Sequence, residues 1–337
     1  MGNGSQQSAG WKNLRSEFCA LTSKGLESLC ADEISKKFGC KATASGGGCV
    51  FFNYEGDKDA LYKNLRSVHF LVQVIAKSES VKIDEGTAKL IGSSILVRVV
   101  PSNNLLEAKV GGLIFDQLAA LGKQVRVEFK QPETFIRCWT YGKKLVVGID
   151  WGKTQMSRRL RVFTTRFSLN PVSAYALAAV NNVPGNKAFL VTNEGSELVE
   201  AALIGGPGKI FGAGVNKIIH RGARQNATVA GVIDNIELLE PPWEPAFESL
   251  SNSGLSSIGA QLNFKHDSEG NAAVKTFQRL ISCAKGKLAP DGWVNILVRV
   301  EDKKDFEGAA AGYSLGFTLE FMQGELGLAL LGFKSLG

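Results

Sequence analysis

Apolar and polar residues alternate in different ways along the chain, and the N-terminal part predicts short strands and helices in turn. A short apolar strand at 18–21 precedes a helix that carries Leu26, Cys30, Ile34 and Phe38 on one face. Gly39 is expected to end this helix, because glycine readily adopts the left-handed conformation of a helix end. A second strand at 49–52 and a helix capped by Asp57 complete the pattern.

The next part, residues 77–150, predicts one strand at 95–100, one helix at 110–121 and three further strands. These strands are expected at 124–129, 134–140 and 144–149. In the first of them Val125, Val127 and Phe129 alternate with charged residues, which predicts one buried and one exposed face.

From Pro171 onward helices and strands alternate, which is typical of a parallel sheet covered on both faces. Two final apolar strands, at 315–321 and 326–333, are joined through Gln323-Gly324 and predict a closing antiparallel hairpin. The stretch 240–270 shows no clear pattern and is expected to be irregular. The predicted fold class is therefore α+β in the N-terminal half and α/β in the C-terminal half.

Charge changes this picture at one place. The chain has 39 Lys and Arg against 32 Asp and Glu, a net charge of +7, which permits a polyanionic partner. The stretch 151–170 has no acidic residue and contains two phenylalanines, Phe163 and Phe167. Its cations are the candidate RNA contacts: Lys153, Arg158, Arg159, Arg161 and Arg166. Arginine with aromatic residues suits phosphate contact and base stacking. The alternative is a solvated connector that packs on the following domain.

Other classes are excluded by what the sequence lacks. Its six cysteines form no C-x-x-C pair, so no zinc or redox site is expected. No apolar run reaches the roughly 20 residues of a membrane span. Residues 1–12 are expected to be a flexible N-terminus without a signal-peptide core. An intracellular compartment is expected, with cytoplasm and organelle left open.

Several segments, in order, resemble the THUMP-containing guanine-N2 RNA methyltransferases. They are Leu21-Thr22-Ser23-Lys24-Gly25-Leu26-Glu27, Arg161-Val162-Phe163-Thr164 with Leu169-Asn170-Pro171, the apolar helix from Ala174 to Ala179, Ala223-Arg224-Gln225-Asn226-Ala227, and Gly324-Glu325-Leu326. The resemblance spans nearly the whole chain, and the order and spacing of the pieces make it specific.

The resemblance implies a ferredoxin-like domain at 13–76, a THUMP domain at 77–150, a basic linker at 151–170 and a Rossmann-like methyltransferase domain at 171–337. It implies that the N-terminal half grips structured RNA, such as tRNA, rRNA or snRNA, and not DNA or a membrane. It also implies an S-adenosylmethionine site and methylation of a guanine amino group. Some relatives use a small activator subunit, and a ribonucleoprotein complex is a further expected setting.

The cofactor motifs depart from the family pattern. In the first motif, Asn193 and Glu194 stand where the family has Gly and Ser, while Gly195 and Ser196 keep its Gly-Thr character. In the second motif, Gly214 stands where an acidic residue would bind the ribose hydroxyls. Asn216 could replace that residue only if the chain shifted. Residues 251–270 contain no Asn-Pro-Pro-aromatic catalytic motif. Glu240-Pro241-Pro242-Trp243 is interpreted as a rigid turn rather than a substitute for it.

Three hypotheses follow. The favoured one is an RNA-binding protein of methyltransferase fold without catalysis, acting as a scaffold, assembly factor or complex subunit. The second is an active S-adenosylmethionine-dependent guanine-N2 methyltransferase with a site rebuilt around Gly195, Gly214 and Asn216. Together with Ser196, these are the residues predicted to be vestigial cofactor contacts. The third is a protein interaction module that uses the former cofactor face. No resident cofactor, no metal and no catalytic residue are expected under the first hypothesis.

Overall fold

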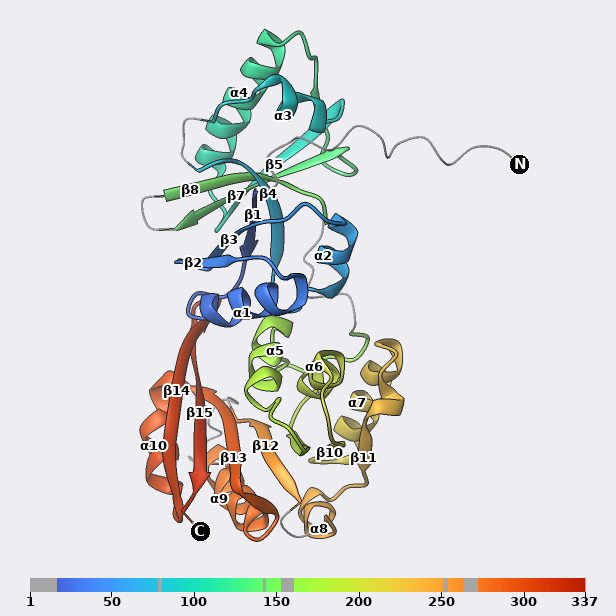
Figure 1. Cartoon of the computed structure of the whole chain (residues 1–337), viewed down its shortest axis with the longest axis vertical. Coiled ribbons are helices and arrows are strands. Elements are labelled where there is room, and N and C mark those ends of the chain that lie inside the picture. The colour runs from blue at the N-terminus through green and yellow to red at the C-terminus, as the bar shows by residue number, and fades with distance from the viewer. Residues whose placement is uncertain are drawn as a thin grey trace, which may run out of the picture. The chain divides into compact units, whose positions relative to one another are not determined.

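The chain forms two compact units in the computed structural model (Figure 1). The structure describes residues 17–77, 81–141, 144–152, 161–250, 254–262 and 272–336. The first unit comprises Met1–Thr22 and Glu27–Met156, and the second Ser23–Leu26 and Ser157–Gly337. The predicted flexible segment 1–12 and the predicted RNA contacts Lys153, Arg158 and Arg159 lie outside the described residues.

One sheet of eight strands runs through the first unit. In order across the sheet, its strands are β2 (Ala42–Gly46), β3 (Cys49–Asn53), β1 (Glu17–Leu21), β4 (Phe70–Ala76), β8 (Lys144–Asp150), β7 (Thr134–Tyr141), β5 (Ser94–Val100) and β6 (Arg126–Val127). β4 and β8 pair antiparallel, with Val72 opposite Asp150. The segments predicted as ferredoxin-like and THUMP domains therefore share a continuous sheet.

Four helices accompany this sheet within the described part of the first unit. They are α1 (Glu27–Phe38), α2 (Lys58–Asn64), α3 (Glu85–Leu90) and α4 (Asn104–Ala120). Asp57 caps α2 as predicted, because its carboxylate accepts a hydrogen bond from the Asp59 backbone N–H. α4 begins six residues earlier than predicted, since Asn103 caps it by accepting from Leu106 N–H.

The predicted strand at 124–129 is the clearest error in this unit. Only Arg126 and Val127 pair with β5, at the edge of the sheet. Val127 is 50% exposed and Phe129 69% exposed, so their alternation with charged residues does not mark a buried face. Periodicity gave the wrong prediction here because a strand this short, at the edge of a sheet, has no second layer to cover it.

The second unit contains a seven-stranded sheet that confirms the predicted α/β architecture. In order across it, the strands are β11 (Glu237–Leu239), β10 (Ile210–Gly214), β9 (Asn186–Val191), β12 (Leu255–Gln261), β13 (Leu288–Arg299), β15 (Leu326–Ser335) and β14 (Tyr313–Gln323). The first five are parallel, and β15 runs antiparallel to both β13 and β14. The predicted hairpin is thus present, with Gly324 at φ 65° in its turn.

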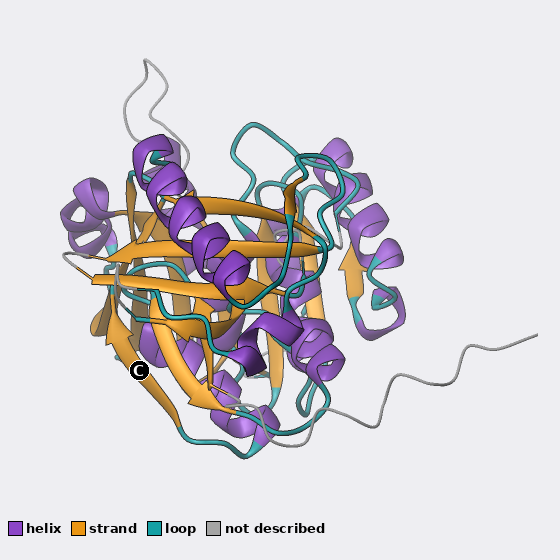
Figure 2. Ribbon diagram, turned by 90° about the horizontal axis from the view of Figure 1, so that it is seen from above, coloured by secondary structure: helices purple, strands orange, loops and turns teal. Residues whose placement is uncertain are grey.

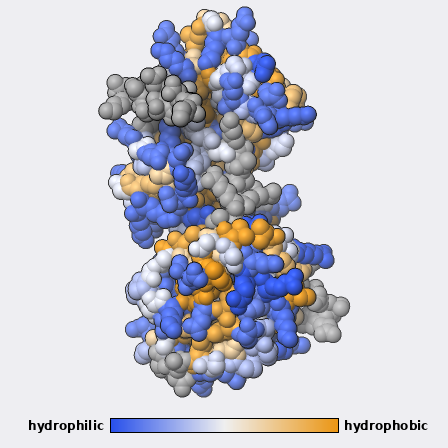
Figure 3. All heavy atoms as spheres, turned by 90° about the vertical axis from the view of Figure 1, so that its right-hand side faces the viewer, coloured by the Kyte–Doolittle hydropathy of each residue, from blue (hydrophilic) through white to orange (hydrophobic). Residues whose placement is uncertain are grey.

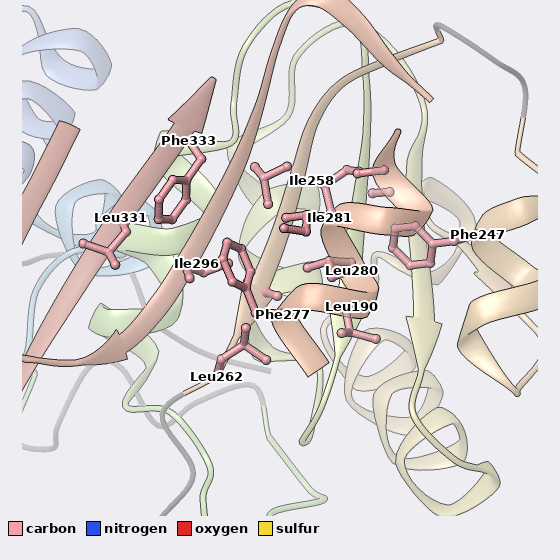
Figure 4. Close-up of a cluster of buried hydrophobic side chains, with 14 of the residues drawn as sticks. Leu190, Phe247, Ile258, Leu262, Phe277, Leu280, Ile281, Ile296, Leu331 and Phe333 are labelled. Atoms are coloured by element: carbon pink, nitrogen blue, oxygen red, sulfur yellow. The ribbon is translucent and has the colours of Figure 1, made fainter. Parts of the chain in front are cut away.

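Helices cover both faces of this sheet (Figure 1 and Figure 2). Those that share one core are α5 (Pro171–Val180), α6 (Ser196–Ile204) and α7 (Lys217–Val229). Those that share the other are α8 (Trp243–Glu248), α9 (Ala272–Ala284) and α10 (Lys303–Ala309). Short 3-10 turns, η2 (Ile233–Asn235) and η3 (Val300–Asp302), complete the unit. Figure 4 shows Phe277 of α9 directed at strand residues, with its ring 5.3 Å from that of Phe333.

The stretch 240–270, expected to be irregular, contains α8 and the central strand β12. β12 was missed because its sequence, Leu-Ser-Ser-Ile-Gly-Ala-Gln, is rich in small and polar residues. Their size is dictated by neighbours: a Cβ at Gly259 would lie 2.6 Å from the Phe189 ring. The buried Ser257 hydroxyl donates to the Asn181 carbonyl at 3.0 Å. Across the described residues, no helix combines the length and apolar character needed to cross a bilayer.

Candidate functional site

The candidate site lies where the parallel strands of the second unit end. The carboxyl ends of β9, β10 and β12 meet at one edge of the sheet, the usual ligand-binding edge of such folds. The predicted vestigial cofactor residues Gly195, Ser196, Gly214 and Asn216 all follow or end β9 and β10, which are neighbours. The structure therefore brings all four to the same edge.

Gly195 and Ser196 serve the turn between β9 and α6. Gly195 caps α6 with φ 72° and ψ 26°, a left-handed conformation that favours glycine. A Cβ there would also lie 2.7 Å from the Cβ of Ala223 on α7. Ser196 is buried, and its hydroxyl donates to the Glu194 carboxylate at 2.8 Å. Local folding thus accounts for both residues without a cofactor.

Gly214 and Asn216 fix the start of α7. A Cβ at Gly214 would lie 2.9 Å from the backbone nitrogen of His220, so an acidic side chain has no room there. Asn216 is the helix cap, and its side-chain oxygen accepts from the N–H groups of Ile218 and Ile219 at 2.9 and 3.0 Å. That oxygen is therefore engaged within the fold.

Glu194 is the residue around which this edge is organised. Its side chain is fully buried, and Oε1 accepts hydrogen bonds from the Leu169 N–H at 3.1 Å and from Arg161 Nη1 at 3.2 Å. Arg161 is held in turn, since the same nitrogen donates to the Leu169 carbonyl. Only 16% of the Arg161 side chain is exposed. Arg161, predicted to contact RNA, thus has its guanidinium in an internal ion pair.

Glu197 lies one residue beyond Ser196 and is almost completely buried. Neither of its carboxylate oxygens, nor Oε2 of Glu194, accepts a hydrogen bond from the residues that the structure describes. Burial, and secondarily the negative charge of Glu194, raise the pKa of Glu197 from 4.5 to about 8. The site therefore holds two buried carboxyl groups, one of which is paired with Arg161. The sequence suggests Glu194 and Glu197 as a carboxylate pair, but it gives no sign that both are buried.

The described part of the predicted linker packs onto this edge. We call residues Arg161–Asn170 the latch. The buried amide of Asn226 on α7 accepts from Val162 and Phe163 N–H and donates to the Phe163 and Glu194 carbonyls, all at 2.9–3.0 Å. The matching helix motif of α7 therefore has a structural role, because its asparagine ties the latch to the loop after β9.

Two further contacts hold the latch across the strand ends. The Thr165 hydroxyl donates to the Asn193 side chain at 2.9 Å, and the Gln261 amide donates to the Phe167 carbonyl at 2.7 Å. The outer side of the latch is accessible: Phe167 is 39% exposed, with the exposed Arg166 guanidinium 5.6 Å from its ring centre. The inner side of the latch packs on the strand ends, while Arg166 and Phe167 are exposed on its outer side.

The position of the missing catalytic motif is now defined by β12. Gln261 ends this strand and is fully buried, and the stretch 263–270 lies outside the described residues. Glu240-Pro241-Pro242-Trp243 leads into α8 instead, with Pro242 at its cap. Trp243 is 5% exposed and packs edge-on against Phe247, with ring centres 5.9 Å apart. It is not available to stack on a base.

Among the residues that the structure describes, no cluster of three or more His, Cys, Asp or Glu residues could hold a metal ion. All six cysteines are free thiols, four of them buried.

No protein-family model matches the chain, and no curated protein matches its sequence. Solved structures do share its fold. TrmN from Thermus thermophilus aligns with a TM-score of 0.75 and 22% identity, over 95% of this chain and 99% of that one. SMU.472, a putative methyltransferase complexed with SAH, aligns with a TM-score of 0.73 and 17% identity, over 95% and 98%. A predicted N6-adenine-specific DNA methylase from Listeria monocytogenes aligns with a TM-score of 0.71 and 15% identity, over 95% and 96%. The chain therefore has, over nearly its whole length, the fold of TrmN and these methyltransferase-like proteins.

Proposed function

We propose that the chain is an RNA-binding protein of methyltransferase fold that does not transfer methyl groups. The observation that carries this proposal is the Arg161–Glu194 contact. An anionic side chain, with the latch bound to it, stands in the loop where the resembling family has small residues that let the cofactor approach. The second hypothesis, a rebuilt active site, would need this loop to open.

The residues present do not fit S-adenosylmethionine, on two structural grounds. Asn193 and Glu194 both hold the latch across the end of β9, so cofactor entry would have to break hydrogen bonds to Thr165, Leu169 and Arg161. At the end of β10, Gly214 supplies no carboxylate for the ribose hydroxyls, and the backbone of His220 leaves no space for one. Two lost hydrogen bonds to a charged group weaken binding by about 10²- to 10⁴-fold, at roughly 1.5–3 kcal/mol each.

RNA is supported as the partner by charge and by the outer side of the latch. The chain carries a net charge of +7. Arg166 lies beside the exposed ring of Phe167, an arrangement that suits phosphate contact and base stacking. Lys153, Arg158 and Arg159 belong to the same proposed basic segment. The ion pair with Glu194 gives Arg161 a positioning role in this proposal, because it holds the latch in place.

The proposal is tested by measuring RNA affinity and methyl transfer on the same protein. Fluorescence anisotropy with a labelled structured RNA should show binding that weakens with salt, while transfer of labelled methyl from S-adenosylmethionine stays at the level of a blank. Arg166→Gln should lower RNA affinity roughly 3- to 10-fold, since one charge-assisted contact is lost. Lys275→Gln on α9 is the matched control. Methyl transfer above the blank would contradict the absence of catalysis, and no RNA binding would contradict the RNA partner.

A further inference from the structure

Helix α7 presents a row of cations on its outer face. Lys217, Arg221 and Arg224 are all exposed and are spaced four and three residues apart, so they lie on one side of the helix. At 1.5 Å rise per residue the row spans about 10 Å along the helix axis. Figure 3 views the side on which α7 lies in Figure 1, where groups of hydrophilic residues border a hydrophobic patch on the surface of the second unit.

The fold itself provides little to balance this charge. The sequence has no Asp or Glu between Glu200 and Asp234. None of the three cations forms an ion pair with a residue that the structure describes. Arg224 Nη2 lies 3.4 Å from Nε2 of His220, and the Glu240 carboxylate lies 3.5 Å from that same nitrogen rather than beside a cation of the row. Elsewhere in the same unit exposed cations do have acidic partners, as in the pairs Arg279–Glu244 and Lys303–Glu320.

The charges on α7 also oppose the stability of the helix. Lys217 lies in the first turn, at the positive end of the helix dipole, where an acidic residue would be favourable. Lys217 and Arg221 form a like-charged pair four residues apart, which destabilises a helix. Residues whose charges destabilise their own helix are typical of binding sites, because a bound anion relieves the repulsion between them.

We propose that the outer face of α7, formed by Lys217, Arg221 and Arg224, is a binding site for the phosphate backbone of RNA, separate from the latch. Each nucleotide of an RNA strand carries one negatively charged phosphate, so the row of three cations can engage up to about three of them. Ile218, 72% exposed, directly follows Lys217 on the helix and can pack on a sugar. This site rests on the proposed function, because it requires that the chain binds RNA.

The test compares three full-length proteins by fluorescence anisotropy with a labelled stem–loop RNA at several salt concentrations. The α7 variant carries K217Q, R221Q and R224Q. The control carries K275Q, R279Q and K285Q, which removes equal charge from exposed residues on and directly after α9, on the other face of the sheet. Circular dichroism and the Tm verify that both variants are folded.

The α7 variant should bind on the order of 10- to 100-fold more weakly, and its slope of log affinity against log salt should fall by about 2–3. The control should stay within roughly 2-fold of the wild type. Equal losses in both variants, or wild-type affinity in the α7 variant, would overturn this site while leaving RNA binding intact. A wild-type protein that does not bind the RNA would overturn both proposals.

A polyglutamate competitor identifies the occupant. It should displace the RNA far less effectively than unlabelled stem–loop at the same concentration of charge. If polyglutamate displaces the labelled RNA as well as unlabelled stem–loop does, and this displacement is lost in the α7 variant, RNA is overturned as the partner in favour of an acidic protein segment.

Discussion

Each unit places an arginine beside a buried carboxylate, and the two arrangements differ in how well positive and negative charges balance. In the first unit, Nε and Nη2 of Arg137 both lie 2.9 Å from Oδ2 of Asp150, and the guanidinium lies between the rings of Phe70 and Phe135, at 3.7 and 4.8 Å. In the second unit, Arg161 makes one contact with Glu194, and Glu197 adds a second buried carboxyl group beside it.

The Arg137–Asp150 contact is a structural ion pair, whereas the group formed by Arg161, Glu194 and Glu197 is under electrostatic strain. One positive and one negative charge in good geometry can be tolerated in a core, provided that each keeps its partner. Three carboxylate oxygens without hydrogen bonds from described residues are the opposite case. Buried polar atoms without partners concentrate at places that serve, or once served, a purpose other than stability. The loop after β9 and the start of α6 therefore hold buried carboxyl groups that stability alone does not explain.

The largest expected effect comes from breaking the balanced pair. Asp150→Asn leaves the Arg137 charge buried, and we expect the free energy of unfolding to fall by about 3–5 kcal/mol. Chemical denaturation at neutral pH measures this loss. The double variant Arg137→Met with Asp150→Asn should recover much of it, because the uncompensated charge is gone. A loss below about 1 kcal/mol in the single variant would mean that the pair is not a structural requirement.

We expect a smaller effect at Glu197, where the substitution raises the free energy of unfolding instead of lowering it. Because its pKa is raised from 4.5 to about 8 in the folded chain, the protonated form is the one that folding favours. Its contribution to stability is fully present below pH 4.5, declines as the pH rises toward 8 and is lost above that value. Glu197→Gln removes this titration and should stabilise the protein at pH 9 by on the order of 3 kcal/mol, with little change at pH 4.

Denaturation curves at several pH values measure this effect. Glu237→Gln is the matched control, since the Glu237 side chain is 54% exposed and its pairing with Lys209 is a surface contact. Parallel stability–pH profiles for Glu197→Gln and the wild type would contradict the strain assigned to this site.

Much of the architecture could be predicted from the sequence because it depends on periodicity. The β–α alternation after Pro171, the closing hairpin and the cap at Asp57 all depend on patterns within a few residues of each other. β12 could not be predicted in this way. It is buried on both faces by its neighbours, and the Phe189 ring beside Gly259 requires small residues in place of the apolar run that marks a central strand.

The sequence predicts where along the chain the site lies, but not which of its residues contact one another. Glu194 was identified as an anion in the cofactor loop, and Arg161 as a basic residue of the linker, which are 33 residues apart in sequence. Their contact depends on Asn226, which holds the latch from α7 and gave only a family-like helix motif as its signal. Tertiary pairing of this kind leaves no local pattern.

The most direct test of the central claim is calorimetric titration of the purified protein with S-adenosylmethionine and S-adenosylhomocysteine. A variant with Asn193→Gly and Glu194→Ser, which restores the family residues of the first motif, serves as the comparison. We expect no binding heat from the wild type at high micromolar ligand, and at most weak binding by the variant, because Gly214 still supplies no ribose contact. A micromolar isotherm for the wild-type protein would contradict the account and would show that this edge of the sheet still holds the cofactor.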